Sequence, residues 1–420
     1  MNFTDYEWLR KRGPQMANIL NDCIEAERSA RLRPMHTMIV ARRALENIYQ
    51  ERCGKYRIQF TELWAAIDAV RACLPLSPEV RDEIKEDSDY IRHKGNKDVH
   101  PKKNSKIKVH AATTDRIEEA LIVLEKLYKV MSLLYGEPRG KSFRRNRVPF
   151  DEYEIDRMIL DPTAPTMTRY FVRGSNGRTY FLQSLSNKEM AEFEKRRQAA
   201  NKLVYENRRR YSDRLLLPMN ISLPDESDRK LLLYEAYPES FLLCEQKELK
   251  KTMKLKDALK LGLDLLEALE KLKRLDMHHR SIYPGCIMVE SGENGGYEAY
   301  LMDLHTSKII NSNVTVVAKL MSAYDSSLYV PACLQGRPLD NVDWEKVDVF
   351  AVCRVVLFCI DSTLVPCTST GVFRDHAELK NAPGMRTIYN RILLPDPKLR
   401  NIPTMKELKE LFQNEYDHCK

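Results

Sequence analysis

The first third of the chain places apolar residues at the spacing of one helix face. Phe60, Leu63, Ile67, Val70 and Leu74 recur at intervals of three and four residues, which puts them on one side of a helix. Residues 38–48 and 117–131 repeat the same spacing. Residues 1–136 are therefore predicted to form five helices with short connections, which is the pattern of an all-α helical bundle.

Three positions indicate where these helices begin and end. Ser77 followed by Pro78 is typical of an N-cap and a first helical turn, and it predicts a helix through about His93. Gly95, followed by Asn96, is expected to stop this helix in a left-handed turn. Gly136 is expected to end the last helix.

From about residue 151 the pattern changes to short strands mixed with helices. TRYFVR at 168–173 and RTYFLQSL at 178–185 flank a GSNG turn and predict a hairpin. Residues 215–220 and 230–237 are predicted as strands, and residues 286–290 and 300–304 as a second hairpin. Helices are expected at 188–210 and 258–272. The whole chain is thus predicted as a helical bundle followed by an α+β region.

Positive charge is concentrated before this α+β region. Residues 1–150 contain 29 Lys and Arg against 21 Asp and Glu, whereas the numbers are equal in the rest of the 420-residue chain. Residues 137–150 form a basic linker with five cationic side chains: Arg139, Lys141, Arg144, Arg145 and Arg147. Such a cluster either contacts phosphates, as in RNA binding, or is a solvated spacer between two domains.

Composition and cysteine spacing favour a cytoplasmic protein with no membrane partner. Hydrophobic residues make up 43% of the chain, which excludes a wholly disordered protein. The longest apolar stretch, residues 349–360, contains Arg354 and is too short to cross a bilayer. The first residues lack the apolar segment of a signal peptide. The ten cysteines form no CxxC pair, so reduced thiols are expected rather than disulfides or zinc.

Five segments of the second region resemble protein kinase motifs, in the order that kinases have them. MHHRSIYPGCIMVE at 277–290 resembles the catalytic loop and its strand, and YLMDLHTSKI at 300–309 resembles the metal-binding segment. Residues 327–338, 347–358 and 393–408 resemble three later kinase segments. The resemblance implies a bilobal protein kinase-like domain at 151–420, with an N-lobe at about 151–240 and a C-lobe at about 241–420.

The polar positions of this resemblance have lost their usual residues. Gln183 stands where kinases have the phosphate-binding lysine, Ser281 where they have the catalytic base, and Cys286 where they have the second metal ligand. The domain is therefore expected to be a pseudokinase without phosphotransfer activity that requires no cofactor. Asp303 remains as a weak candidate metal ligand. Gln183, Glu235 and Asp303 form the candidate nucleotide cleft, which leaves weak Mg-ATP binding open.

Four further residues match kinase positions with a structural role. They are His279, Arg280, Asp348 and Arg400. In kinases a glutamate usually pairs with the residue that Arg400 matches, and Cys333 occupies the position of that glutamate. The match of these residues supports the kinase-like fold and does not support catalysis.

The helical region resembles a bacterial family related to the HEPN superfamily. The resemblance lies in VARRALENIYQERCG at 40–54, the helix at 60–74 and YIRHKGNKDVHP at 90–101. It implies a homodimer through the bundle, and Arg92 with His100 as a candidate ribonuclease pair in which His removes the 2′-hydroxyl proton and Arg neutralises the phosphate. The alternative is structural, with both residues hydrogen-bonding the loop formed by Gly95 and Asn96.

Three functions follow from these resemblances. The first is a non-catalytic pseudokinase sensor or docking module that controls the helical domain through an unknown protein partner, in bacterial stress or phage defence. The second is a metal-independent HEPN-type ribonuclease that the pseudokinase regulates. The third is a divergent ATP-dependent protein kinase.

Overall fold

The chain forms two compact units, each made of several segments of the chain. The computed structural model describes residues 1–99, 114–138, 141–159, 168–186, 198–207, 214–219, 229–249, 253–292, 296–304, 307–310, 329–331, 342–360, 383–392 and 398–419. The first unit comprises Met1–Met158, Tyr170–Asn187 and Ile221–Leu231, and the second comprises Ile159–Arg169, Lys188–Asn220 and Leu232–Lys420. The domain limits at residues 136 and 150 stay predictions.

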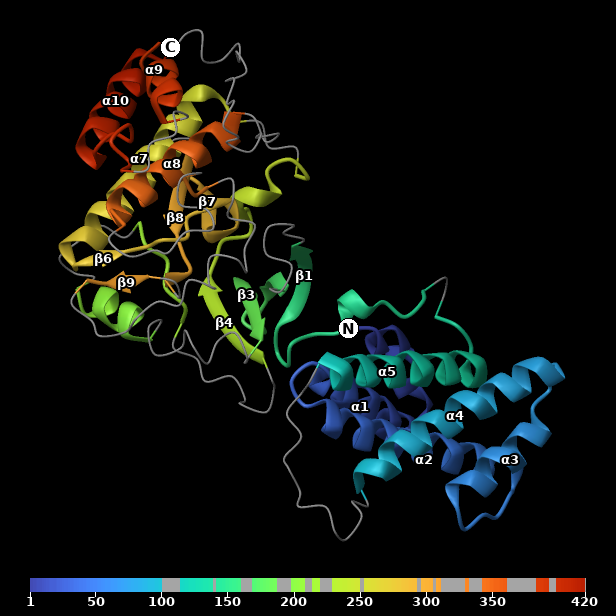
Figure 1. Cartoon of the computed structure of the whole chain (residues 1–420). Helices are drawn as coiled ribbons and strands as arrows, with labels where there is room; N and C mark the ends of the chain where they lie inside the picture. Colours follow the sequence, from blue (N-terminus) through green and yellow to red (C-terminus); the bar gives the residue numbers. More distant parts are fainter. Residues whose placement is uncertain are drawn as a thin grey trace. The chain divides into compact units, whose positions relative to one another are not determined.

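The N-terminal part is helical, as the periodicity predicted. A 3-10 helix, η1 (Phe3–Arg12), precedes α1 (Pro14–Ser29), α2 (Pro34–Tyr56), α3 (Leu63–Cys73), α4 (Pro78–Val99) and α5 (Thr114–Tyr135) (Figure 1). Helix α2 packs against the other four α-helices. Its residues Ala41, Leu45 and Ile48 are fully buried, so the apolar stripe of α2 forms the centre of this core.

Two of the three predicted helix ends are confirmed. The backbone N–H of Val80 donates to Ser77 Oγ at 3.5 Å at the start of α4, which is the expected N-cap contact. Gly136 follows α5 with φ at 99° and donates its N–H to the carbonyl of Ser132 at 2.9 Å. A left-handed residue at this point favours glycine.

The predicted turn at Gly95 is wrong, because α4 continues to Val99. A Cβ atom at Gly95 would lie 2.6 Å from Arg42 Cβ and 2.9 Å from the carbonyl oxygen of Met38. Gly95 thus allows α4 to approach the backbone of α2. Packing against α2 offsets the roughly 1 kcal/mol that glycine costs inside a helix, and Asn96 is helical as well.

The α+β part begins with a four-stranded sheet in the order β1-β2-β3-β4. Its strands are β1 (Glu154–Ile159), β2 (Thr168–Arg173), β3 (Thr179–Ser186) and β4 (Arg229–Glu235). The β2–β3 hairpin and β4 confirm the predictions, and β1 was not predicted. The strand predicted at 215–220 is wrong for its described residues, 215–219, because only Leu215 forms an isolated bridge, to Leu301.

Within the described residues, the second unit combines short antiparallel strands with four longer helices and a helical segment at 198–206. This segment confirms the described part of the helix predicted at 188–210. One sheet has the order β5-β7-β8, and β6 pairs with β9. The predicted hairpin is confirmed as β7 and β8, and the predicted helix as α7. The elements are β5 (Phe241–Leu242), η4 (Leu243–Glu245), α7 (Leu255–Arg274), β6 (Met277–His278), η5 (Pro284–Cys286), β7 (Ile287–Ser291), β8 (Tyr297–Leu301), β9 (Lys308–Ile309), α8 (Trp344–Ile360), α9 (Pro383–Ile392) and α10 (Met405–His418).

Helices α7 and α8 form the core of the second unit. Helix α7 packs against α8, α10 and β8. Residues Val347–Leu357 of α8 are all buried, as expected for a helix that is apolar on nearly every side. Within the described residues, no helix is both long enough and apolar enough to span a bilayer.

Candidate functional site

The loop between β6 and η5 is fixed by a carboxylate on α8. Asp348 accepts the backbone N–H of His279 at 2.9 Å and that of Arg280 at 2.7 Å. His279 donates from Nε2 to the carbonyl of Met302 at 2.7 Å. Burial raises the pKa of Asp348 to about 7, although the two N–H bonds act in the opposite direction. Three of the four residues expected to be structural therefore meet in one place.

Arg280 and Arg400 are placed differently. Arg280 has a left-handed backbone, with φ at 73°, and its guanidinium lies 4.0 Å from the ring centroid of Trp344. This cation–π contact holds the side chain against α8. Arg400 is exposed, in the segment before α10. Cys333 lies outside the described residues.

Asp303 follows β8 and is buried in an ion pair. Its backbone φ is 65°, and its side chain is 1% exposed. Arg169 Nη2, from a side chain with no exposed surface, lies 3.4 Å from Asp303 Oδ2. Tyr234 Oη donates to Oδ1 of the same carboxylate at 3.3 Å. Both oxygens of Asp303 are therefore engaged by protein groups.

The polar contacts continue into the β6–η5 loop. Arg169 Nη2 donates to Tyr283 Oη at 2.6 Å. The thiol of Cys286 accepts the N–H of Tyr283 at 3.3 Å and lies 3.1 Å from the carbonyl oxygen of that residue. Ser281 is half-buried beside them. We refer to Arg169, Tyr234, Tyr283 and Asp303 as the buried arginine cluster.

The buried arginine cluster does not fit a magnesium ion. Magnesium requires oxygen ligands in near-octahedral geometry at about 2.0–2.1 Å, and a guanidinium beside Asp303 repels a second cation. Cys286, at the other expected ligand position, offers a thiol in contact with backbone atoms. Among the residues that the structure describes, no group of three or more His, Cys, Asp or Glu side chains could hold a metal.

The other two residues of the predicted nucleotide cleft have different surroundings. Gln183 lies fully buried in β3, in the first unit. Glu235 ends β4 in the second unit and is exposed. The cleft of Gln183, Glu235 and Asp303 therefore stays a prediction.

Sequence reasoning missed Arg169 and Tyr234. Strand β2 reads TRYFVR, and residues 169–172 are all buried. An arginine inside an otherwise apolar strand requires an acidic partner, because an unpaired buried charge is very costly. This was the signal that could have identified Arg169, although it does not specify Asp303 as the partner.

The candidate ribonuclease pair is only partly described. His100 lies outside the described residues. Arg92 Nη2 lies 3.0 Å from Asp89 Oδ1 and 2.9 Å from His93 Nε2. Sequence reasoning treated His93 only as a helix end. The structure thus places an exposed histidine beside Arg92 on α4.

The basic linker packs on the helices through ion pairs. Arg147 and Lys141 contact the two oxygens of Asp5 at 2.7 and 2.9 Å, and Arg145 contacts two glutamates of α5 at 2.5 and 3.1 Å. Burial alone would raise the pKa of the Asp5 carboxyl, but these two cations outweigh it and lower that pKa. Ion pairs therefore hold residues 141–147 against the helices, although most of these residues are exposed. Arg139 lies outside the described residues.

A contact between an arginine and two aromatic rings also attaches the helices to strand β2 within the first unit. The guanidinium of Arg31, just after α1, lies 5.0 Å from the ring centroid of Phe150 and 5.7 Å from that of Tyr170 on β2. The two rings are 4.9 Å apart, and Arg31 Nε donates to the carbonyl of Val148 at 2.9 Å. We call Arg31, Phe150 and Tyr170 the junction cluster. It joins the helices to the β2–β3 hairpin.

No protein-family model matches this chain, and no curated protein has a significantly similar sequence.

Proposed function

We propose that residues 151–420 form a protein kinase-like module that does not transfer phosphate and acts as a sensor or docking module for the helical region. The buried ion pair between Arg169 and Asp303 carries this proposal. A carboxylate engaged by an arginine and a tyrosine is not available to hold the metal that phosphoryl transfer requires.

The surroundings of the pair support both parts of the proposal. The anchoring of His279 and Arg280 by Asp348 supports a kinase-like loop. Ser281 and Cys286 on that loop supply neither a general base of suitable pKa nor a hard metal ligand. The module would therefore retain the kinase-like loop but lack the side chains that catalyse phosphate transfer.

The junction cluster supports a regulatory role. It ties the β2–β3 hairpin to α1 inside one compact unit. A partner that alters the hairpin would thus act on the helices directly. The resemblance of the helices to HEPN-related bacterial proteins is the ground for proposing stress or phage defence as the setting.

Labelled ATP tests the absence of phosphotransfer. The full chain is incubated with Mg-ATP and generic protein substrates, and incorporation of label is measured for the wild type and for Asp303→Ala. We expect no incorporation in either, and no shift in Tm with Mg-ATP beyond that with Mg²⁺ alone. Incorporation that Asp303→Ala abolishes would establish the divergent kinase in place of this proposal.

The contact between Arg92 and His93 favours a second candidate, a metal-independent ribonuclease in the helical region. To accept a 2′-hydroxyl proton at Nε2, a neutral His93 would exchange its contact with Arg92 for one with the substrate, and Arg92 would then stabilise the phosphate. The test is cleavage of single-stranded RNA in EDTA by the wild type, His93→Ala and His100→Ala, with His418→Ala on α10 as control. Loss of cleavage in His93→Ala alone would identify that histidine, and an inactive wild type would reject the candidate.

A further inference from the structure

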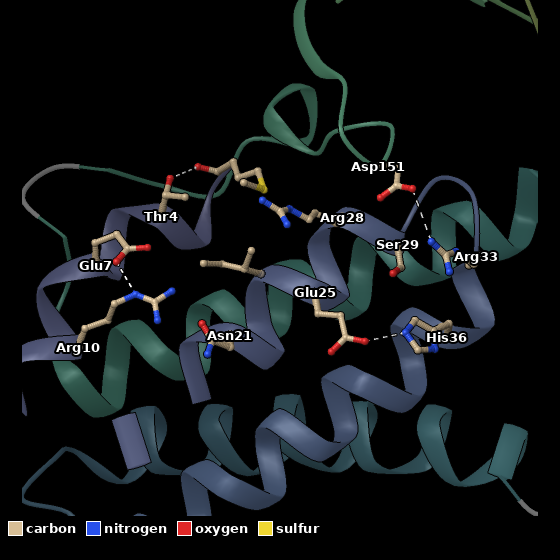
Figure 2. Close-up of a pocket in the computed structure, with 12 residues that line it drawn as sticks. Thr4, Glu7, Arg10, Asn21, Glu25, Arg28, Ser29, Arg33, His36 and Asp151 are labelled. Atoms are coloured by element: carbon tan, nitrogen blue, oxygen red, sulfur yellow. Dashed lines mark hydrogen bonds and ion pairs between the residues drawn. The ribbon is translucent and has the colours of Figure 1, made fainter. Parts of the chain in front are cut away.

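A polar groove of about 560 Å³ opens in the first unit. It lies between η1, α1, the beginning of α2 and Asp151, which follows the basic linker (Figure 2). None of the residues matched to kinase motifs, and neither residue of the candidate ribonuclease pair, lines this groove. Its volume falls within the range of small-molecule sites, roughly 300–1,000 Å³.

Helix periodicity directs these side chains into the groove. Thr4, Glu7 and Arg10 recur every three residues in η1, and residues at that interval align in a 3-10 helix. On α1, Glu25 and Arg28 are separated by three residues and lie on one face of the helix. Two aligned rows of polar side chains therefore face the same space.

Each acidic side chain of the groove has a basic partner. Three such pairs are marked by dashed lines in Figure 2: Glu7 with Arg10 at 2.6 Å, Glu25 with His36 at 2.9 Å, and Asp151 with Arg33 at 3.6 Å. Arg43 also contacts Glu25, at 2.8 Å. These carboxylates keep lone pairs free for hydroxyl donors, because each can accept about four hydrogen bonds.

Arg28 differs from the other cations of the groove. It is exposed, and within the described part of the chain no acidic side chain pairs with its guanidinium (Figure 2). A guanidinium of this kind binds phosphate through two parallel N–H···O bonds. The groove thus offers one available cation surrounded by groups that hydrogen-bond hydroxyls.

The lining also limits the class of ligand. No Phe, Tyr or Trp is among the groove's lining residues, and its one imidazole, that of His36, is paired with Glu25, so the groove lacks the large rings on which nucleobases usually stack. Asn21 and the three carboxylates instead suit a ligand with several hydroxyl groups. We infer that this groove binds a small phosphorylated polyol of the sugar phosphate class, with its phosphate on Arg28.

Calorimetric titration of the full chain with ribose 5-phosphate tests the inference. We expect saturable one-to-one binding to the wild type and at least about tenfold weaker binding to Arg28→Ala. Arg28→Lys should have an intermediate affinity, because lysine keeps the positive charge but cannot donate two parallel hydrogen bonds to the phosphate. Arg178→Ala, which removes an exposed arginine from the β2–β3 turn of the same unit, should bind as the wild type does. Because Arg28 is exposed, its replacement should leave Tm unchanged.

Three further probes separate the parts of the inference. Ribose should not bind measurably, and inorganic phosphate should bind more weakly than ribose 5-phosphate. Gluconate, a carboxylated polyol, should also bind more weakly. Equal binding of ribose 5-phosphate by the wild type and Arg28→Ala, or no binding by the wild type, would overturn the site. Equal or tighter binding of phosphate or gluconate would overturn the ligand class.

Discussion

Two arginines of strand β2 form ion pairs that should contribute differently to stability, because only one of the pairs is buried. Arg169 lies 3.4 Å from Asp303, and Arg173 lies 3.4 Å from Asp156. The first pair is almost completely buried, whereas the side chains of the second are 58% and 44% exposed. Water and salt screen the exposed pair, but removal of one buried partner leaves a charge that nothing solvates.

Replacement of Arg169 by Met should therefore lower the free energy of unfolding by about 3–5 kcal/mol. The double variant Arg169→Met, Asp303→Asn should recover part of this loss, because it removes the orphaned charge and keeps an acceptor for Tyr234. Urea denaturation followed by circular dichroism measures both. Arg173→Met is the matched control on the same strand, with an expected loss of about 0–1 kcal/mol. Equal losses at the two arginines would contradict a dominant role of burial.

At the scale of elements, the close contact between α2 and α4 requires glycine, the residue without a Cβ atom, at position 95. Gly95→Ala would place a methyl group 2.6 Å from Arg42 Cβ and 2.9 Å from the backbone of Met38. The helices must then separate, and we expect a loss of about 1–3 kcal/mol in the free energy of unfolding. Gly54→Ala, with nothing within 4 Å of the new methyl group, should instead gain up to about 1 kcal/mol from helix propensity. Thermal and urea denaturation of the two variants compare them.

The basic linker gives a second prediction at this scale. Arg147→Ser breaks its bonds with buried Asp5 and should cost about 1–3 kcal/mol. Arg144→Ser should cost less than about 0.5 kcal/mol, because this exposed neighbour has no ion pair within the described residues. Urea denaturation distinguishes the two. Similar values for both variants would indicate that the linker is not anchored through Asp5.

The same anchor makes stability depend on pH. The pKa of the Asp5 carboxyl is lowered in the folded chain, so the folded state binds fewer protons than the unfolded state. Asp5 therefore contributes stability that is complete above about pH 4 and is lost as pH falls through its folded pKa. We expect Asp5→Asn to be less stable than the wild type at neutral pH, by a difference that shrinks below about pH 4. Denaturation across this range tests it, with Asp156→Asn, in an exposed pair, as control.

Local pattern located most of the helices and strands but not the contacts between them. Apolar periodicity located the helices and both hairpins, because burial of one face decides them. Gly95 was misjudged because a glycine at a helix end and a glycine at a helix crossing look the same in sequence. Asp348 was expected to be structural from its resemblance to a kinase position, and it accepts the N–H groups of His279 and Arg280. The partners of Asp303 come from β2 and β4, which only the folded chain brings to it.

At the scale of the molecule, the first unit combines helices and a sheet hairpin that are far apart in sequence. Residues 1–158 and 170–187 belong to it together, and the junction cluster lies where they meet. The compact units therefore do not follow the change from helical to mixed secondary structure.

This arrangement predicts that the helices and the β2–β3 hairpin unfold as one cooperative unit. Phe150→Ala removes a 5% exposed ring from the junction cluster and should cost about 3 kcal/mol. Hydrogen exchange should show equal loss of protection in peptides from α1 and β3. Peptides from α10, in the second unit, should change little. Loss of protection confined to β3 would contradict a shared cooperative unit.

Because Arg169 is the counterion of Asp303, this part of the fold does not depend on the concentration of nucleotides in the cell. A magnesium–nucleotide complex leaves a carboxylate whenever its concentration falls, but a guanidinium is tethered to the chain and stays protonated at every physiological pH. The negative charge of Asp303 is thus neutralised by a counterion that cannot be diluted, chelated or hydrolysed. Starvation, which depletes nucleoside triphosphates, would therefore leave this part of the fold intact.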